Sequence, residues 1–169
     1  ITPYDLLVGK LLGLGTLGLL QMIVWLLVGV VGLQFSGSFE FLSAVVIPPD
    51  FIVIVLLYFV LTYFLYASFL AGIGAVMGSE QESRTIAGLA LLPNAIPMML
   101  LSVLILNPDS PIFTVLTFIP FTAGMTYMLR YPFSAVPLWE VIASLSILTL
   151  SMFLVTWISA KVFRWALLL

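Results

Sequence analysis

The chain has 169 residues, of which 63% are hydrophobic and only 7% are charged, and its net charge is −2. A soluble domain of this composition would lack the polar side chains needed to cover its surface, so the composition indicates a membrane protein. Cysteine and histidine are absent, which excludes disulfides, thiolate or imidazole metal sites and the commonest general base. We therefore expect no catalytic, cofactor-binding or metal-binding residue, and no basic cluster offers a nucleic-acid site.

Four segments are long and apolar enough to cross a membrane as helices, which takes about 20 residues each. They cover residues 6–33, 51–77, 86–106 and 138–160. The sequence thus predicts an all-α membrane protein with four transmembrane helices. Two glycine pairs with a spacing of four, Gly9 with Gly13 and Gly74 with Gly78, predict places where helix backbones approach closely, either by ordinary packing within the bundle or at a dimer seam.

The second and third spans are joined by the polar stretch GSEQESR, Gly78 to Arg84. Ser79 followed three residues later by Glu82 fits a capping box at the start of the third span, and Glu80 lies near the positive end of the helix dipole. Capping explains these residues without any function. It leaves open why Arg84 and a further acid lie on a tight turn that a partner subunit could bind.

The third span contains Pro93 and Pro97, with Asn94 between them. Each proline removes a backbone hydrogen bond and crowds the preceding turn, so we expect a kink there. The kink is either a hinge in a transport cycle or an irregularity of the kind that membrane helices tolerate. Gln21 in the first span is the other amide at depth, and it could bind a polar group or bridge two helices.

The stretch before the last span, residues 112–130, is apolar but interrupted by Pro120 and Gly124. Two arms of about nine residues reach only ~13 Å each, enough to enter a membrane and return. We predict a re-entrant helical hairpin before the last span, packed against the spans because irregular backbone at that depth must be covered.

The basic residues predict the orientation. With four spans, one side of the membrane holds four of them: Lys10, Arg84, Lys161 and Arg164. The positive-inside bias makes that side, with both ends of the segment, cytoplasmic. Arg130 and Glu140 are then expected outside or at the outer interface. No ionisable residue lies in the middle of a span, which disfavours a proton-coupled carrier.

Four ordered motifs resemble a known family: TPYDLLVGKLLG with Gln21 and Trp25 downstream, YASFLAGIGAVMGSEQES, NPDSPIFTVLTFIPFTAGM and VPLWE. They look like the second half of a type-2 ATP-binding-cassette (ABC) transporter permease, in the branch that includes sodium-efflux permeases. The resemblance covers essentially the whole chain. It implies a six-span subunit of which this chain holds the last four spans, without the first two and the outer domain often inserted between them. Gly124 departs from the proline often found in relatives.

The chemistry of the residues and the resemblance together suggest roles for individual residues. Candidates for coupling to an ATPase are Pro3, Asp5, Lys10, Glu80, Glu82 and Arg84. Candidates for the translocation path or a hinge are Gln21, Pro93, Asn94, Pro97, Pro120, Phe121 and Thr122.

The function expected from the resemblance is a permease subunit of an ABC exporter in a bacterial or archaeal inner membrane. It is not itself an enzyme, because no Gly-rich phosphate loop with Lys and Ser/Thr is present; ATP and Mg²⁺ are expected on a partner ATPase. Further expected partners are a second permease copy or a homologous permease, and the lipid bilayer. A non-catalytic assembly or scaffold subunit is the alternative, and a membrane-embedded enzyme a weaker one. The cargo is open among sodium, a lipid, a drug and a peptide.

Overall fold

The computed structural model describes residues 3–34 and 48–166, and every regular element in these ranges is an α-helix. The long helices are α1 (Pro3–Gln34), α3 (Pro49–Val76), α4 (Glu80–Met99) and α8 (Leu138–Ala166). The short helices are α5 (Leu101–Leu106), α6 (Pro111–Phe118) and α7 (Ala123–Arg130). With α4 and α5 counted together, four segments are long and apolar enough to span a membrane. The predicted all-α membrane fold with four spanning helices is confirmed.

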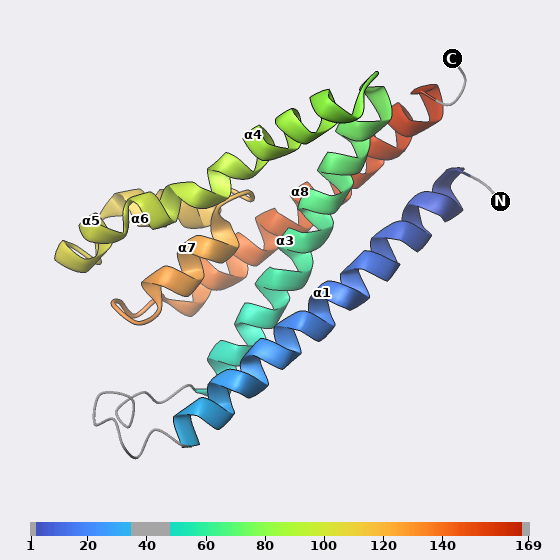
Figure 1. Ribbon diagram of the computed structural model, residues 1–169. Coiled ribbons are helices and arrows are strands. Elements are labelled where there is room, and N and C mark those ends of the chain that lie inside the picture. Colours follow the sequence, from blue (N-terminus) through green and yellow to red (C-terminus); the bar gives the residue numbers. More distant parts are fainter. Residues whose placement is uncertain (1–2, 35–47, 167–169) are drawn as a thin grey trace.

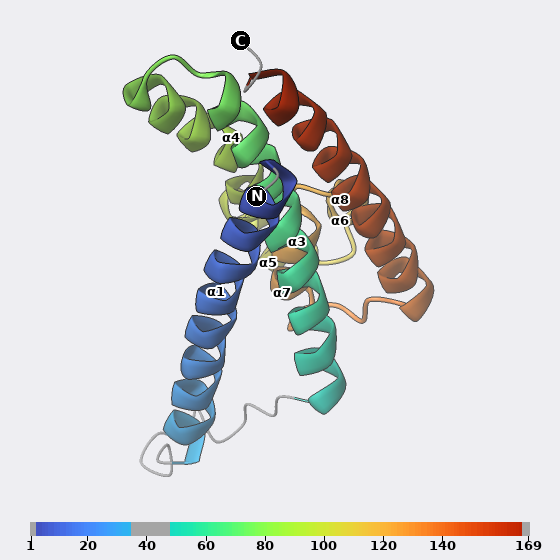
Figure 2. The same ribbon diagram turned by 90° about the vertical axis from the view of Figure 1, so that its right-hand side faces the viewer.

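Helix α3 is the centre of the bundle. It lies between α1 and α8 (Figure 2) and also contacts α4 and α7. The Pro3 end of α1, the α3–α4 turn and the Ala166 end of α8 lie at one end of the bundle, which we call the turn end (Figure 1). The pair α6 and α7 lies toward the opposite end, the hairpin end, where α8 begins (Figure 1).

A single buried stripe along α3 organises the core. Tyr58, Leu65 and Gly72 are buried at intervals of seven residues, and this spacing puts them on one face because seven residues make about two helical turns. Tyr58 and Leu65 belong to a core cluster with Tyr127 of α7 and Leu148 of α8. The stripe therefore packs on α7 and α8.

At the turn end, the same stripe brings α3 very close to α8. The hydroxyls of Ser68 and Thr156 lie 2.9 Å apart and share a hydrogen bond. A Cβ atom built on Gly72 would lie 2.5 Å from the Ser159 hydroxyl oxygen and 3.2 Å from the Ser159 Cα. Only glycine leaves room for α8 at this point.

The two glycine pairs that the sequence singled out do not make this contact. Cβ atoms built on Gly9, Gly13, Gly74 and Gly78 would meet no described atom within 4 Å. Gly74 is two residues beyond Gly72, a rotation of about 200°, so it lies on the opposite face of α3. The prediction of close packing at these pairs is wrong within the described chain, and the close approach uses Gly72 instead.

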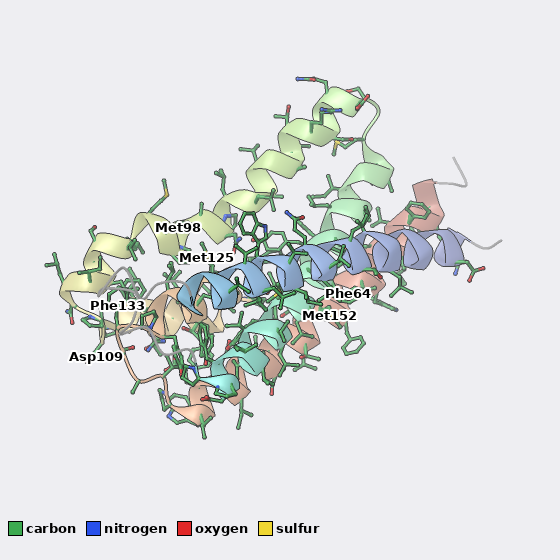
Figure 3. The ribbon with its side chains drawn as sticks, turned by 60° about the horizontal axis from the view of Figure 1, so that its bottom comes forward. Phe64, Met98, Asp109, Met125, Phe133 and Met152 are labelled. Carbon is green, nitrogen blue, oxygen red and sulfur yellow. The ribbon has the colours of Figure 1, made fainter. Side chains whose placement is uncertain are left out.

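The third predicted span is divided into two helices. Helix α4 continues through Pro93 and Pro97 in helical conformation, and the interruption comes at Leu100, after which α5 begins. In Figure 3 the α4 ribbon changes direction before it reaches Met98. The two prolines leave this part of the helix with fewer hydrogen bonds, because neither can donate to the carbonyl four residues earlier.

We expect Gly72→Ala to lower the free energy of unfolding by about 1 to 3 kcal/mol, because the new methyl group overlaps Ser159. Gly74→Ala is the matched control and should be neutral or slightly stabilising, since its Cβ enters open space on an exposed helical position. Thermal stability in detergent measures both. Adding Ser159→Gly should restore part of the loss, and equal stabilities of the Gly72 and Gly74 variants would contradict the assignment.

Candidate functional site

The turn between α3 and α4 shows the Ser79 half of the predicted capping box. The Ser79 hydroxyl accepts a hydrogen bond from the Glu82 backbone N–H at 3.2 Å, which satisfies one of the free amides in the first helical turn. Glu80 pairs with Arg84 one turn later at 2.7 Å, and both side chains are largely exposed. The Glu82 carboxylate is exposed and has no ion-pair partner in the described part of the chain. The turn therefore presents one uncompensated negative charge.

The coupling candidates on α1 lie at the same end of the molecule. Pro3, Asp5 and Lys10 belong to the first turns of α1, and the Asp5 side chain is exposed. Because the α3–α4 turn is also at the turn end (Figure 1), the structure brings both groups of coupling candidates to one end of the bundle.

The hairpin apex is the connection between α6 and α7, and Thr122 closes it. The buried Thr122 hydroxyl donates to the Leu116 carbonyl at 2.6 Å and lies 3.2 Å from the Ile119 carbonyl. The Ala123 backbone N–H also donates to Ile119, at 2.9 Å. These bonds satisfy carbonyls at the end of α6, which would otherwise lack partners. Thr122 thus holds the apex together, and its hydroxyl proton is already donated within the hairpin.

Tyr66, to which the sequence analysis gave no role, lies between the path candidates of α4 and those of the hairpin apex. The Tyr66 hydroxyl on α3 donates to the Phe121 carbonyl at 2.9 Å, and its ring packs edge-to-face on the Phe121 ring with centroids 5.3 Å apart. The backbone of Asn94 faces the same hydroxyl. Pro97 on the next turn of α4 is buried. The α4 proline segment and the hairpin apex therefore meet at Tyr66.

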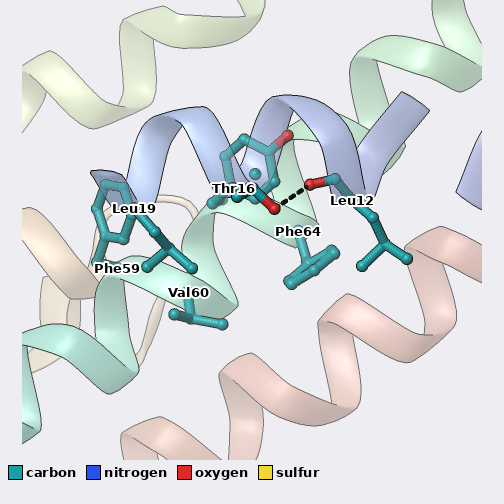
Figure 4. A pocket seen from close by; sticks show the side chains of 8 residues that line it. Leu12, Thr16, Leu19, Phe59, Val60 and Phe64 are labelled. Carbon is teal, nitrogen blue, oxygen red and sulfur yellow. Dashed lines mark hydrogen bonds between the residues drawn. The ribbon is translucent and has the colours of Figure 1, made fainter. Parts of the chain in front are cut away.

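Gln21 is not part of this junction, because its side chain is exposed on α1. Helix α1 instead borders a small hollow of about 70 Å³ against α3 (Figure 4). Eight residues line it: Leu12, Gly15, Thr16, Leu19, Phe59, Val60, Tyr63 and Phe64. The Thr16 hydroxyl donates to the Leu12 carbonyl of its own helix at 2.8 Å. The lining is mostly apolar and offers little to bind an ion.

A buried ion pair lies at the hairpin end. Arg130, in the last turn of α7, donates through Nη1 to Glu140 Oε1 in the first turn of α8. The two side chains are only 6% and 3% exposed. The sequence predicted only that both residues lie outside or at the outer interface. It did not predict that they form a buried pair enclosed by the hairpin and α8.

Thr117 extends this pair into a polar cluster, which we call the Arg130 cluster: Tyr58, Thr117, Arg130, Glu140 and Ser144. The Thr117 hydroxyl accepts from Arg130 Nη1 at 2.9 Å, and its carbonyl accepts from the Ser144 hydroxyl at 2.6 Å. Helices α6, α7 and α8 are thereby tied together. Tyr58 contributes from α3; its hydroxyl lies beside Ser144 but reaches no hydrogen-bond partner among the described atoms.

A signal for this pair was present in the sequence. Arg130 and Glu140 are the only charged residues between Asp109 and Lys161, and they have opposite signs. Two charges within an otherwise apolar stretch are expected to pair, because an isolated buried charge is costly. Sequence distance alone could not show that the intervening loop folds back far enough to join them.

We expect Arg130→Met or Glu140→Met alone to lower the free energy of unfolding by about 3 to 5 kcal/mol, because each leaves an unpaired buried charge. The double variant should be more stable than either single one, since no charge then remains buried. Arg84→Met, which breaks the exposed pair with Glu80, is the control and should cost less than about 1 kcal/mol. Unfolding in detergent measures all four. A single variant as mild as Arg84→Met would contradict the importance of the pair.

Comparisons with known proteins fit this arrangement. A family model described as "ABC-2 family transporter protein" matches residues 1–161. The uncharacterized protein MJ1024 of Methanocaldococcus jannaschii is 28% identical over 98% of this chain, and the uncharacterized protein YhaP of Bacillus subtilis is 28% identical over 96%. The chain spans 39% and 40% of the lengths of these two relatives. No solved structure matches significantly.

The family match extends over nearly the whole chain, and its four apolar helices are those expected of a membrane transport component. This chain therefore belongs to the ABC-2 family of transporter proteins, which form the membrane-spanning permeases of ABC transporters.

Proposed function

We propose that the chain forms part of the permease subunit of an ABC exporter, which moves its substrate outward and is driven by ATP hydrolysis on a partner ATPase. The observation that carries this proposal is the α3–α4 turn. It is capped by Ser79, bears the exposed charges of Glu80, Glu82 and Arg84, and directly begins the helix that reaches the hairpin. A soluble partner can reach such a turn, whereas it cannot reach the buried junctions.

We further propose that the turn end is cytoplasmic and that the α6–α7 hairpin is re-entrant from the outside. Four of the five basic residues lie toward the turn end, and the fifth, Arg130, is neutralised by Glu140. This distribution supports the positive-inside orientation more clearly than the sequence did. Asp109, before α6, and Phe133, after α7, both lie toward the hairpin end (Figure 3), which supports a segment that enters and leaves on one side.

The remaining partners follow from the same proposal. ATP and Mg²⁺ are bound by the ATPase, and a second copy or a homologous permease completes the path.

For the cargo, we favour a lipid, a drug-like amphiphile or a peptide over sodium. The middle of these spans carries no acidic side chain that would hold a cation.

The topology can be tested by cysteine labelling, because this chain has no cysteine of its own. Single cysteines at the exposed positions Ser79, Asn107 and Phe133 should react with a membrane-impermeant reagent from the cytoplasm, the outside and the outside, respectively. Labelling of Phe133→Cys from the cytoplasm would replace the re-entrant hairpin with a full crossing.

The partner can be tested by copurification of the full-length protein with a candidate ABC ATPase, whose hydrolysis should rise on assembly. The double variant Glu80→Gln, Glu82→Gln should fold normally, because the Ser79 cap is kept, but should weaken the apparent affinity for the ATPase about two- to fivefold, a few tenths to 1 kcal/mol. Asp109→Asn, an exposed charge change toward the hairpin end, is the control and should have no effect. Lack of any stimulation by the parent protein would favour a scaffold subunit.

A further inference from the structure

The junction at Tyr66 holds the hairpin apex by both its backbone and its side chain. Tyr66 is 8% exposed, and its hydroxyl donates to the Phe121 carbonyl at 2.9 Å. Phe121 lies in the connection between α6 and α7, outside both helices, so its carbonyl has no helical partner of its own. The Tyr66 bond supplies one, as a buried carbonyl requires.

The Phe121 ring is held from two positions on α3. Tyr66 and Phe69, one helical turn apart, both pack edge-to-face on it, with centroids 5.3 and 5.4 Å away. Aromatic pairs of this geometry are favourable beyond the area that they bury. The apex therefore cannot move away from α3 without breaking these contacts together.

Helix α4 approaches the same junction with its proline segment. Helix α4 contacts both α3 and α7, and the backbone of Asn94 lies close to the Tyr66 hydroxyl. Asn94 lies between Pro93 and Pro97, where two backbone hydrogen bonds of the helix are missing. From Glu80 to Pro93, the helix is uninterrupted and about 20 Å long. A displacement of the capped turn would thus reach Asn94 through a rigid segment.

We infer that Tyr66 is a positioning residue that links α4 to the hairpin apex, so that movement of the α3–α4 turn is transmitted to the hairpin. This inference rests on the proposed function, because it assigns the route by which binding of an ATPase at the turn acts on the opposite half of the bundle. Tyr66 touches neither the ATPase nor, on this account, the cargo.

The test compares Tyr66→Phe with Tyr63→Phe in the full-length permease, assembled with its ATPase in lipid nanodiscs. Both changes remove one phenolic hydroxyl from α3 and keep the ring, but Tyr63 lies beside Gly15 of α1 instead of the apex. Hydrogen–deuterium exchange is followed at two places: the turn, residues 78–85, and the hairpin amides of Thr122, Ala123 and Thr126, which are bonded across the apex and the start of α7.

Without nucleotide, Tyr66→Phe should speed exchange of the hairpin amides about fivefold, the equivalent of roughly 1 kcal/mol for one lost hydrogen bond. With ATP and vanadate, the turn should respond as in the parent, while the response of the hairpin should be lost. Tyr63→Phe should match the parent in both measurements. A merely structural role for Tyr66 would change the resting exchange and leave the nucleotide response of the hairpin intact.

Two results would overturn the inference but not the proposed function. One is unchanged resting exchange of the hairpin amides in Tyr66→Phe. The other is a hairpin that still responds to nucleotide in that variant, when the turn and the hairpin of the parent both respond. A parent complex in which neither the turn nor ATP hydrolysis responds to assembly would overturn the proposed function, and the inference with it. The two failures are therefore distinguishable.

Discussion

Polar groups that are buried away from water must be bonded inside the protein, and this constraint acts most strongly on the α6–α7 hairpin. Its two eight-residue helices expose backbone groups at four termini within a small volume. Thr122 closes the end of α6, Tyr66 bonds the apex carbonyl, and Ser144 bonds the Thr117 carbonyl. Without these side chains, the interrupted backbone would lose several kcal/mol in an apolar surrounding.

The same constraint explains the position of α3. Helix α3 supplies Tyr58 and Tyr66 to the hairpin region and packs along α8, which supplies Ser144 to the same hairpin. Gly72 makes this possible by removing the side chain where the two helices are nearest. A polar cluster is therefore buried at the hairpin end, beside the apolar cluster of Leu104, Phe113 and Leu116, and small residues pack tightly at the turn end.

This division suits a transport component of the ABC-2 family. The turn end carries the exposed charges and the open glycine faces at Gly74 and Gly78, and the hairpin end carries the Arg130 cluster. Between them, α3 and α4 both join the turn to the hairpin, since each contacts α7. The side chains of the Arg130–Glu140 pair are only 6% and 3% exposed. Such a pair adds little net attraction to the folded state, but separating its charges inside the protein is costly. The pair therefore favours one arrangement of α7 on α8.

Several features could be predicted from the sequence because they depend on local chemistry. Four long apolar segments indicated four spans, Ser79 indicated a helix cap, and Pro120 indicated a break in residues 112–130; hydrophobic length, capping and proline geometry act within a few residues of the chain. The tertiary structure alone decided the pairing of Arg130 with Glu140, the use of Gly72 instead of Gly74, and the contact of Tyr66 with Phe121, 55 residues away. These contacts depend on where helices cross and how each is rotated about its axis, and a rotation by two residues turns a side chain to the opposite face.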